Sequence, residues 1–244
     1  MNAVAGPAGA GRFDEEALKR GVASVRHPLT RALLVLTFTT GVVDAVSFLA
    51  LGRVFTANMT GNVVLLGFGI AGSGGLPVVA PVISLAFFLL GAGAGGALVR
   101  RMGARHPGLV ARALAIEVSL LAAAGVVAAA TDVRPAHASA YVLIALMAFA
   151  MGIRNAAVRR IGVPDLTTTV LTMTLTGLAA ESRAVGGSGK GSIRRLGAAL
   201  AMLAGAVGGA LLLKTSLYLP LVLAAVLALA TWLVYVPAAV RLGR

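Results

Sequence analysis

The chain has 244 residues, of which 59% are hydrophobic and only 12% are charged, and its mean hydropathy is +0.95. A soluble globular domain carries about one quarter charged residues, so this composition excludes a soluble fold and indicates an integral membrane protein. The absence of cysteine excludes disulfides and Cys-ligated metals, and the net charge of +13 fits basic cytoplasmic loops better than a nucleic-acid partner.

Six long apolar runs follow a polar start of the chain. Residues 1–30 lack the apolar core of a signal peptide and are therefore predicted to form a cytoplasmic tail. Each later run is near the roughly 20 residues that cross a hydrocarbon core of about 30 Å as a helix. The runs cover residues 31–52, 76–99, 108–131, 138–158, 196–213 and 217–240. The sequence thus predicts an all-α polytopic membrane protein.

Two shorter segments, 54–72 and 166–180, begin with clusters of threonine and asparagine. If both enter the membrane and return on the side they entered, all Lys and Arg residues except Arg53, Arg134 and Lys214 lie inside. If both cross, the basic residues divide almost evenly between the two sides. Cytoplasmic loops collect Lys and Arg, so we predict six transmembrane helices, two re-entrant half-helix segments and cytoplasmic termini.

The two halves of the chain resemble each other. Residues 41–45 (GVVDA) recur 111 positions later as residues 152–156 (GIRNA), and residues 60–62 (TGN) are matched by residues 172–174 (TMT). A third match joins two glycine-rich stretches at an offset of 113, LGAGAGGALV (90–99) and LAGAVGGALL (203–212). Glycines at such positions allow close helix contact. Each unit has three crossings, an odd number, so the second copy has the opposite orientation in the membrane. This predicts an inverted 3+3 repeat of residues 31–132 and 133–244.

The polar starts of the two short segments are candidates for a solute site. In an inverted repeat they approach each other near the midplane, where helix N-termini offer free amides to an anion or a small polar solute. The alternative is that these side chains cap a helix and bind it to its neighbours. The candidate solute contacts are Asn58, Thr60, Gly61 and Asn62 from the first segment, and Thr168, Thr172 and Thr174 from the second.

Two motifs resemble a known family. GVVDAVSFLALGRVFTANMTGNVVLLG together with GIRNAAVRRIGVPDLTTTVLTMTLTG is similar to the YoaK-like bacterial membrane proteins, domain-of-unknown-function family 1275. The resemblance extends over roughly residues 30–240. It implies a polytopic fold in the bacterial cytoplasmic membrane and leaves substrate and reaction open.

Four residues inside the predicted spans are candidates for a coupling or structural charge. Asp44 lies deep in its helix and is either a proton or ion site or a structural carboxylate, and Asn155 occupies the matching place in the second half. Glu117 and Arg154 lie at similar depth on neighbouring spans, so we expect a buried pair that fixes helix packing.

We predict a transporter or channel for a small polar or anionic solute, with the lipid bilayer as its surroundings and a homo-oligomer as a possible assembly. No metal site or cofactor is expected, because the three histidines are scattered, and no enzyme activity is expected, because no nucleophile has a visible base. The alternative is a structural or interaction membrane protein with eight ordinary membrane segments.

Overall fold

The computed structural model describes residues 28–102, 107–161, 171–189 and 191–242, and within them it contains eight α-helices. Most of the predicted tail, together with Thr168, lies outside the described residues. The helices are α2 (Pro28–Ala50), α3 (Met59–Ile70), α4 (Val79–Met102), α5 (Pro107–Ala130), α6 (Ala138–Ile161), α7 (Leu171–Ala180), α8 (Ser192–Leu213) and α9 (Tyr218–Leu242).

Length separates the helices into two groups. Five of the described helices contain a stretch of at least 21 residues that is long and apolar enough to cross a membrane, namely α2, α4, α5, α6 and α8. α9 has 25 residues, and its side chains are described as far as Val234. α3 has 12 residues and α7 has 10, which is about 18 and 15 Å of helix and far short of a hydrocarbon core of about 30 Å. The chain is a polytopic membrane protein.

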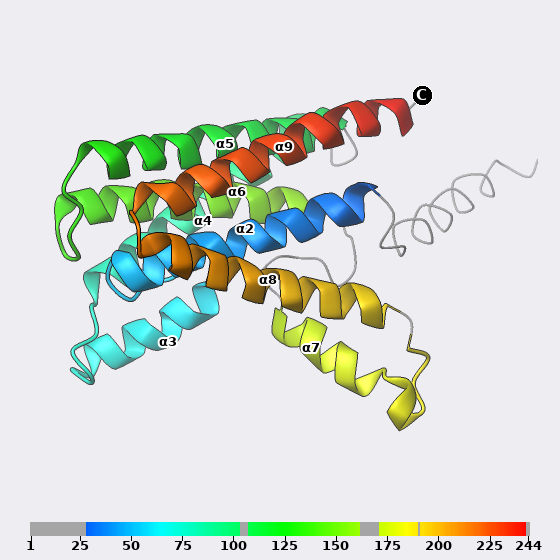
Figure 1. Cartoon of the computed structure of the whole chain (residues 1–244), viewed down its shortest axis with the longest axis horizontal. Coiled ribbons are helices and arrows are strands. Elements are labelled where there is room, and N and C mark those ends of the chain that lie inside the picture. Colours follow the sequence, from blue (N-terminus) through cyan, green and yellow to red (C-terminus); the bar gives the residue numbers. More distant parts are fainter. Residues whose placement is uncertain (1–27, 103–106, 162–170, 190, 243–244) are drawn as a thin grey trace, which may run out of the picture.

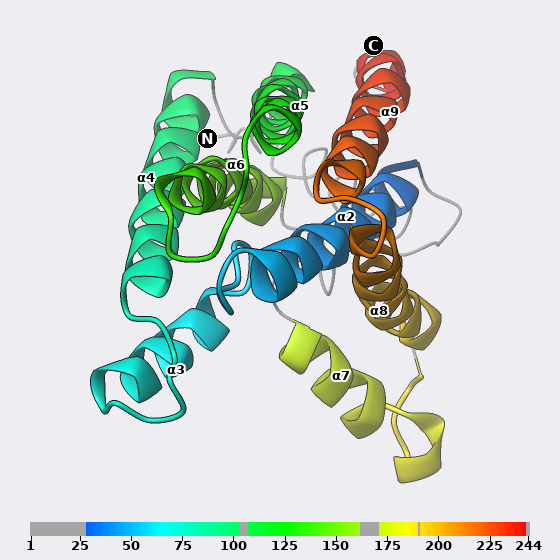
Figure 2. The same ribbon diagram turned by 60° about the vertical axis from the view of Figure 1, so that its left-hand side comes forward.

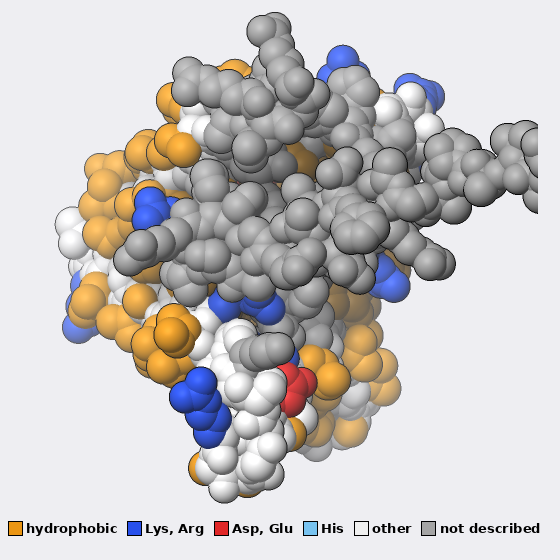
Figure 3. Space-filling view, turned by 90° about the vertical axis from the view of Figure 1, so that its right-hand side faces the viewer, with side chains coloured by type: hydrophobic (Ala, Val, Ile, Leu, Met, Phe, Trp, Pro, Cys, Tyr) orange, Lys and Arg blue, Asp and Glu red, His pale blue; other side chains and the backbone are white. Residues whose placement is uncertain are grey.

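The long helices alternate in direction. α2, α5 and α8 run one way and α4, α6 and α9 run the other, so the start of α2 and the end of α9 lie at the same end of the bundle (Figure 1). We call this the terminal end and the other the opposite end. Basic side chains are spread over the terminal end (Figure 3). The ends of the helices that meet there carry Arg31, Arg100, Arg101, Arg112, Arg159 and Arg194.

α3 and α7 lie beside the bundle, and their first turns are nearer to it than their last turns (Figure 2). Residues 51–58 fold back from the end of α2, and α3 then returns to the opposite end, where α4 begins. α7 leads from within the bundle toward the terminal end, where α8 begins. In Figures 1 and 2 the first turns of α3 and α7 point toward each other, and their last turns diverge.

α2 and α6 are the central helices. Within the most apolar stretch of each helix, 67% of the residues are buried in α2 and 61% in α6. The corresponding shares are 22% in α4 and 17% in α8. The long helices pack in the order α4, α6, α5, α9, α2, α8, while α3 contacts α4 and α7 contacts α8 (Figure 2). The outer faces of α4 and α8 expose leucine, valine and phenylalanine, as expected of surfaces that contact lipid.

Glycines let α2 and α8 cross with their backbones in contact. A Cβ atom on Gly205 would overlap the carbonyl oxygen of Phe38, and one on Gly41 would overlap the carbonyl oxygen of Met202. One turn further along α8, a Cβ atom on Gly209 would lie 3.0 Å from the carbonyl oxygen of Val42. Only residues without a Cβ atom allow this approach, which is the small-residue packing expected between membrane helices.

α4 and α6 cross in the same way. A Cβ atom on Gly91 would overlap the carbonyl oxygen of Phe149, and one on Gly152 would overlap that of Phe88. Phe38 and Phe149 are 111 positions apart, whereas Gly91 and Gly205 are 114 apart. The glycine contacts therefore correspond at an offset of 114, one residue more than the offset of the sequence match. Small residues are so frequent in both stretches that adjacent registers look alike in sequence.

Candidate functional site

Asn62 is the buried side chain of α3, and it holds the returning loop in place. Its Oδ1 accepts a hydrogen bond from the Phe55 amide at 2.8 Å, and its Nδ2 donates to the Phe55 carbonyl oxygen at 2.6 Å. Ser84 of α4 contacts both partners, because its hydroxyl lies 3.1 Å from Nδ2 and donates to the Phe55 carbonyl at 2.6 Å. The Asn62 amide therefore replaces the missing backbone partners of a non-helical segment.

The other polar residues at the start of α3 divide into capping and exposed groups. Asn58 is the N-cap, and its side chain accepts a hydrogen bond from the Gly61 amide at 3.3 Å. A Cβ atom on Gly61 would lie 2.8 Å from the Phe55 ring, so this glycine makes room for the loop. Thr60 is exposed on the first turn. Asn58 is exposed as well, so Thr60 and Asn58 are the two accessible polar side chains at the start of α3.

Asp44 anchors the same loop from α2. Its Oδ1 accepts hydrogen bonds from the amides of Thr56 at 3.1 Å and Ala57 at 2.9 Å, and the residue is only 5% exposed. No hydrogen bond from the described residues reaches Oδ2. Asn155, its counterpart on α6, donates instead to the carbonyl oxygen of Met151 at 2.8 Å.

The start of α7 resembles that of α3 in one respect. Thr174 is the buried residue of α7, as Asn62 is of α3, and the two are 112 positions apart. Thr172 is exposed on the first turn. At the other end of α7, Arg195 of α8 donates to the Gly177 carbonyl oxygen at 2.8 Å and pairs with Glu181 at 2.7 Å.

The predicted pair of Glu117 and Arg154 is present. Arg154 Nε lies 3.0 Å from Glu117 Oε2, Arg154 Nη2 lies 2.8 Å from Oε1, and both side chains are buried. Arg154 also crosses to α2, where Nη1 donates to the Leu36 carbonyl oxygen at 2.6 Å and to the hydroxyls of Thr40 at 2.9 Å and Thr39 at 3.2 Å. One guanidinium therefore joins α6, α5 and α2. The sequence analysis missed the contacts on α2, although two adjacent threonines in a membrane helix were a signal for them.

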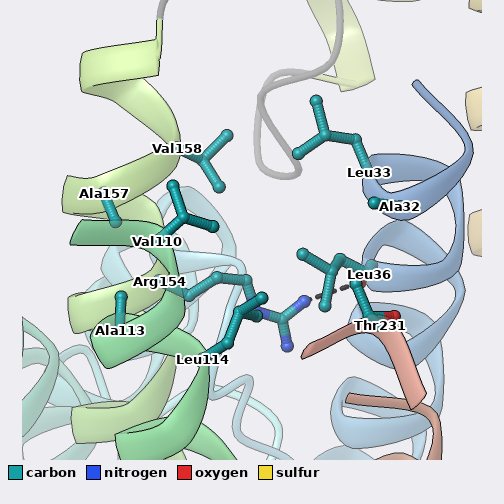
Figure 4. A pocket seen from close by; sticks show the side chains of 10 residues that line it. All are labelled: Ala32, Leu33, Leu36, Val110, Ala113, Leu114, Arg154, Ala157, Val158 and Thr231. Atoms are coloured by element: carbon teal, nitrogen blue, oxygen red, sulfur yellow. Dashed lines mark hydrogen bonds between the residues drawn. The ribbon is translucent and has the colours of Figure 1, made fainter. Parts of the chain in front are cut away.

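A small cavity of about 20 Å³ lies in the terminal half of the bundle between α2, α5, α6 and α9. This is about the room that one water molecule needs. Arg154 reaches across it toward Leu36 on the side nearer the middle of the bundle (Figure 4). Its lining is otherwise mainly apolar and consists of Ala32, Leu33, Leu36, Val110, Ala113, Leu114, Arg154, Ala157, Val158 and Thr231.

Comparison with known proteins decides the family. The family described as "Protein of unknown function (DUF1275)" matches residues 32–234, which is most of the chain. The protein belongs to the DUF1275 family. The resemblance noted from the sequence motifs is thereby confirmed, and the family description carries no function with it.

The DUF1275 protein is also similar to a curated bacterial protein. It is 37% identical over 147 residues to UPF0700 transmembrane protein YoaK of Bacillus subtilis (strain 168), a match that covers 60% of this chain and 64% of YoaK. The chain therefore spans less than two thirds of that relative. No solved structure matches the chain.

The described arrangement gives this DUF1275 protein two separate sets of polar groups. The first set, around Asp44 and Asn62, fixes the loop from which α3 starts. The second, around Arg154 and Glu117, joins three helices in the terminal half. The first turns of α3 and α7 carry the exposed Thr60 and Thr172. Chemically, these turns offer hydroxyls and helix amides, which suit hydrogen bonding and anion binding.

Proposed function

We propose that the protein is a membrane transporter or channel for a small polar or anionic solute, with its site between the first turns of α3 and α7. The observation that carries the proposal is the convergence of these two turns (Figures 1 and 2). A helix N-terminus bears free amides and the positive end of the helix dipole, so two such ends facing each other attract an electronegative solute. Half-helices of this kind form the substrate and ion sites of many secondary transporters.

An inverted 3+3 repeat supports the proposal. Equivalent positions are 111 apart in α2 and α6, 112 apart in α3 and α7, and 114 apart in α4 and α8. The offset increases along the chain, as expected of a duplicated unit that gained one and then two residues between its elements. The strongest contacts also exchange between halves, since α2 packs on α8 and α4 packs on α6. On this basis residues 31–132 and 133–244 form the two repeats, each with three crossings and one re-entrant segment.

The proposed site consists chiefly of Thr60 and Thr172, with the amides of the turns that carry them. Asn58 contributes if its side chain releases the Gly61 amide. Asn62 and Thr174 are buried, so they support the site and do not face the solute. Thr168 stays a prediction, because it lies outside the described residues.

The proposed membrane orientation places the terminal end in the cytoplasm of a bacterium. The arginines at the ends of α4 and α6 and at the starts of α2, α5 and α8 gather at this end, whereas Arg53, Arg134 and Lys214 lie at the opposite one. This distribution follows the positive-inside rule. Both termini are then cytoplasmic, and the protein lies in the inner membrane without cofactor or enzyme activity.

A solute screen on the purified protein tests the proposal. A ligand at 100 times its dissociation constant adds about 2.7 kcal/mol of stability, so a thermal shift identifies candidates. Each candidate is then measured on Thr60→Val and Thr172→Val, which keep volume and lose a hydroxyl. We expect a several-fold loss of affinity in each, because one lost hydrogen bond is worth about 1 kcal/mol. Thr176→Val is the matched control, because that hydroxyl bonds to its own helix.

A ligand that binds both valine variants as tightly as the parent would show that the site lies elsewhere. The competing function is that of a structural or interaction membrane protein, and one observation favours it. Asn58 and Asn62 already have protein partners, so two of the seven predicted solute contacts have a structural task. That alternative expects no small solute to shift the thermal midpoint. Its eight full membrane crossings conflict with the 12 residues of α3.

A further inference from the structure

The buried charges of α2, α5 and α6 do not balance. Two carboxylates, Asp44 and Glu117, and one guanidinium, that of Arg154, are the buried charged groups described on these three helices. Glu117 binds Arg154 with both oxygens, at 3.0 and 2.8 Å. Asp44 forms no ion pair with any residue of the described ranges. One buried negative charge is therefore left without a cation, which is costly in a protein interior and more so in a membrane.

Asp44 also has one unused oxygen. Oδ1 accepts hydrogen bonds from the amides of Thr56 and Ala57, whereas Oδ2 is buried and receives none from the described residues. The adjacent hydroxyl of Ser47 does not bind Oδ2, because it donates to the Asp44 carbonyl oxygen at 3.2 Å. Oδ2 is enclosed by protein, so it has room for a proton and not for a metal ion with its about six oxygen ligands. A proton there would remove the unbalanced charge.

The elements packed against α2 bring no other cation to Asp44. Arg154 is held one turn away at Thr40, and its charge is balanced by Glu117. Arg53 of the returning loop is exposed, and α3 has no ionisable side chain. The ionisable side chains of the loop between α5 and α6 are exposed as well, namely Asp132, Arg134 and His137. On α6, α8 and α9 the other ionisable side chains that the structure describes lie near the helix ends, and they are Tyr141, Arg159, Arg194, Arg195, Lys214 and Tyr218.

We propose that Asp44 is a proton site that controls the loop of residues 51–58, and that loading of the solute site is coupled to uptake of this proton. A proton from the solvent adds to Oδ2 and turns the carboxylate into a neutral acid. The hydrogen bonds from Thr56 and Ala57 then lose their charge and about half of their strength. The loop is released, and with it Asn58 and the first turn of α3. This inference rests on the proposed function and deepens it by naming the coupling ion.

Protonation of Asp44 and binding of an anionic solute favour each other. The two amides that Asp44 holds directly precede Asn58, the N-cap of α3, so the negative charge of Asp44 opposes an anion at that turn. The neutral acid removes this repulsion, and by linkage a bound anion strengthens proton binding by the same factor. Proton and anion therefore load together. The matching residue of the second half, Asn155, does not titrate, so the repeat does not duplicate this site.

Infrared difference spectroscopy on the purified protein detects the proton. Exposed carboxylates titrate near pH 4, so between about pH 8 and about pH 5.5 they stay ionised, and a protonated-carboxyl band that appears in this range comes from a buried group. We expect such a band in the parent. It should shift when aspartate is ¹³C-labelled and not when glutamate is, because Glu117 stays paired with Arg154.

Two variants assign the band to Asp44. Asp44→Asn should abolish it. If that variant does not fold, Asp14→Asn combined with Asp132→Asn and Asp165→Asn answers the same question. This combination leaves Asp44 as the only aspartate of the chain and should retain the band.

Amide exchange measures the release of the loop at the same two pH values. Each rate is divided by that of an unstructured peptide at the same pH, which removes the intrinsic pH dependence of exchange. Protection of Thr56 and Ala57 should fall roughly 10- to 100-fold toward the lower pH, because two charge-assisted hydrogen bonds become neutral ones. In Asp44→Asn protection should be low at both values. Asp132→Asn removes an exposed carboxylate paired with Arg134, and this matched control should keep the response.

The outcomes that overturn the inference are distinct. No protonated-carboxyl band in the parent, or one that persists in Asp44→Asn, shows that Asp44 is not the proton site. A band from Asp44 without a change in protection shows that the proton does not control the loop, and a change in protection that persists in Asp44→Asn belongs to another group. These measurements need no solute, so the valine variants still decide the proposed site between α3 and α7.

The coupling is tested with each ligand that the thermal-shift screen identifies. Its affinity for the parent should rise toward the lower pH, and its affinity for Asp44→Asn should be the same at both values, because asparagine is neutral throughout. A ligand that binds the parent equally well at both pH values would overturn the coupling.

Discussion

Replacing Gly152 by alanine should separate α4 from α6. The new Cβ atom would lie 2.7 Å from the Ala92 amide nitrogen and closer still to the Phe88 carbonyl oxygen, whereas ordinary contacts begin at 3.4 Å. Both obstacles are backbone atoms, so no side chain can move aside, and the helices must part by about 1 Å. Overpacking of this kind costs about 1–3 kcal/mol. Because alanine gains up to about 1 kcal/mol in helix propensity, the net loss is somewhat smaller.

A matched control isolates the steric effect. Gly96 lies on α4 with nothing within 4 Å of a built Cβ atom, so Gly96→Ala gains the helix propensity and meets no obstacle. It should be neutral or slightly stabilising. Gly41→Ala, the counterpart of Gly152→Ala on α2, should be destabilising to a similar degree, because its Cβ atom meets Met202 and Ala206 in the same geometry.

The assay is thermal unfolding of purified protein in one detergent, followed by the fluorescence of the single tryptophan, Trp232. Each kcal/mol shifts the midpoint of a protein of this size by about 2–4 °C. We therefore expect the unfolding midpoint to fall by several degrees in Gly152→Ala and Gly41→Ala. In Gly96→Ala the midpoint should stay the same or rise. The close crossing of α4 and α6 would be refuted if Gly152→Ala and Gly96→Ala had the same midpoint.

Two further predictions concern the buried charges. Glu117→Ala leaves Arg154 buried without its carboxylate and should lower the free energy of unfolding by about 3–5 kcal/mol. Adding Arg154→Met should restore most of the loss in the unfolding midpoint. A double variant whose midpoint is no higher than that of Glu117→Ala would contradict this. Asp44→Asn keeps an acceptor for Thr56 and Ala57 but loses the charge that makes such hydrogen bonds about twice as strong, so amide exchange across residues 51–58 should accelerate. Unchanged exchange would mean that Asp44 does not anchor the loop.

The membrane fold was largely predictable from the sequence, because hydropathy and charge act on long stretches. Runs of about 20 apolar residues mark the spans, and only a helix satisfies its own backbone in lipid. The short segments were recognisable for the same reason, since polar residues at 55–62 conflict with an ordinary span. The sequence did not predict which residues of α4 and α8 correspond to each other. Glycine and alanine alternate so regularly there that only the contacts of Gly91 and Gly205 distinguish an offset of 114 from 113.

The contacts of the polar side chains in the candidate site were only partly predictable from the sequence. The sequence brought polar residues to the starts of two half-helices, yet it gave no means of knowing which of them face outward. Asn62 bonds twice to Phe55 and once to Ser84, a partner 22 residues away on another helix. Such a contact depends on tertiary packing. The pairing of Glu117 with Arg154 was predictable, because two opposite charges at one depth in lipid have few other partners.

The glycine crossings of α2 with α8 and of α4 with α6 have the same geometry, but the charged groups beside them do not recur. The residue 111 positions after Asp44 is Asn155, and the residue 111 positions before Arg154 is Val43. The charge of Arg154 is compensated inside the protein, because its guanidinium pairs with Glu117 and donates to Leu36, Thr39 and Thr40 of α2. A buried, fully paired arginine of this kind joins helices and is not available to a passing anion, so the solute contacts have to come from polar groups outside this cluster.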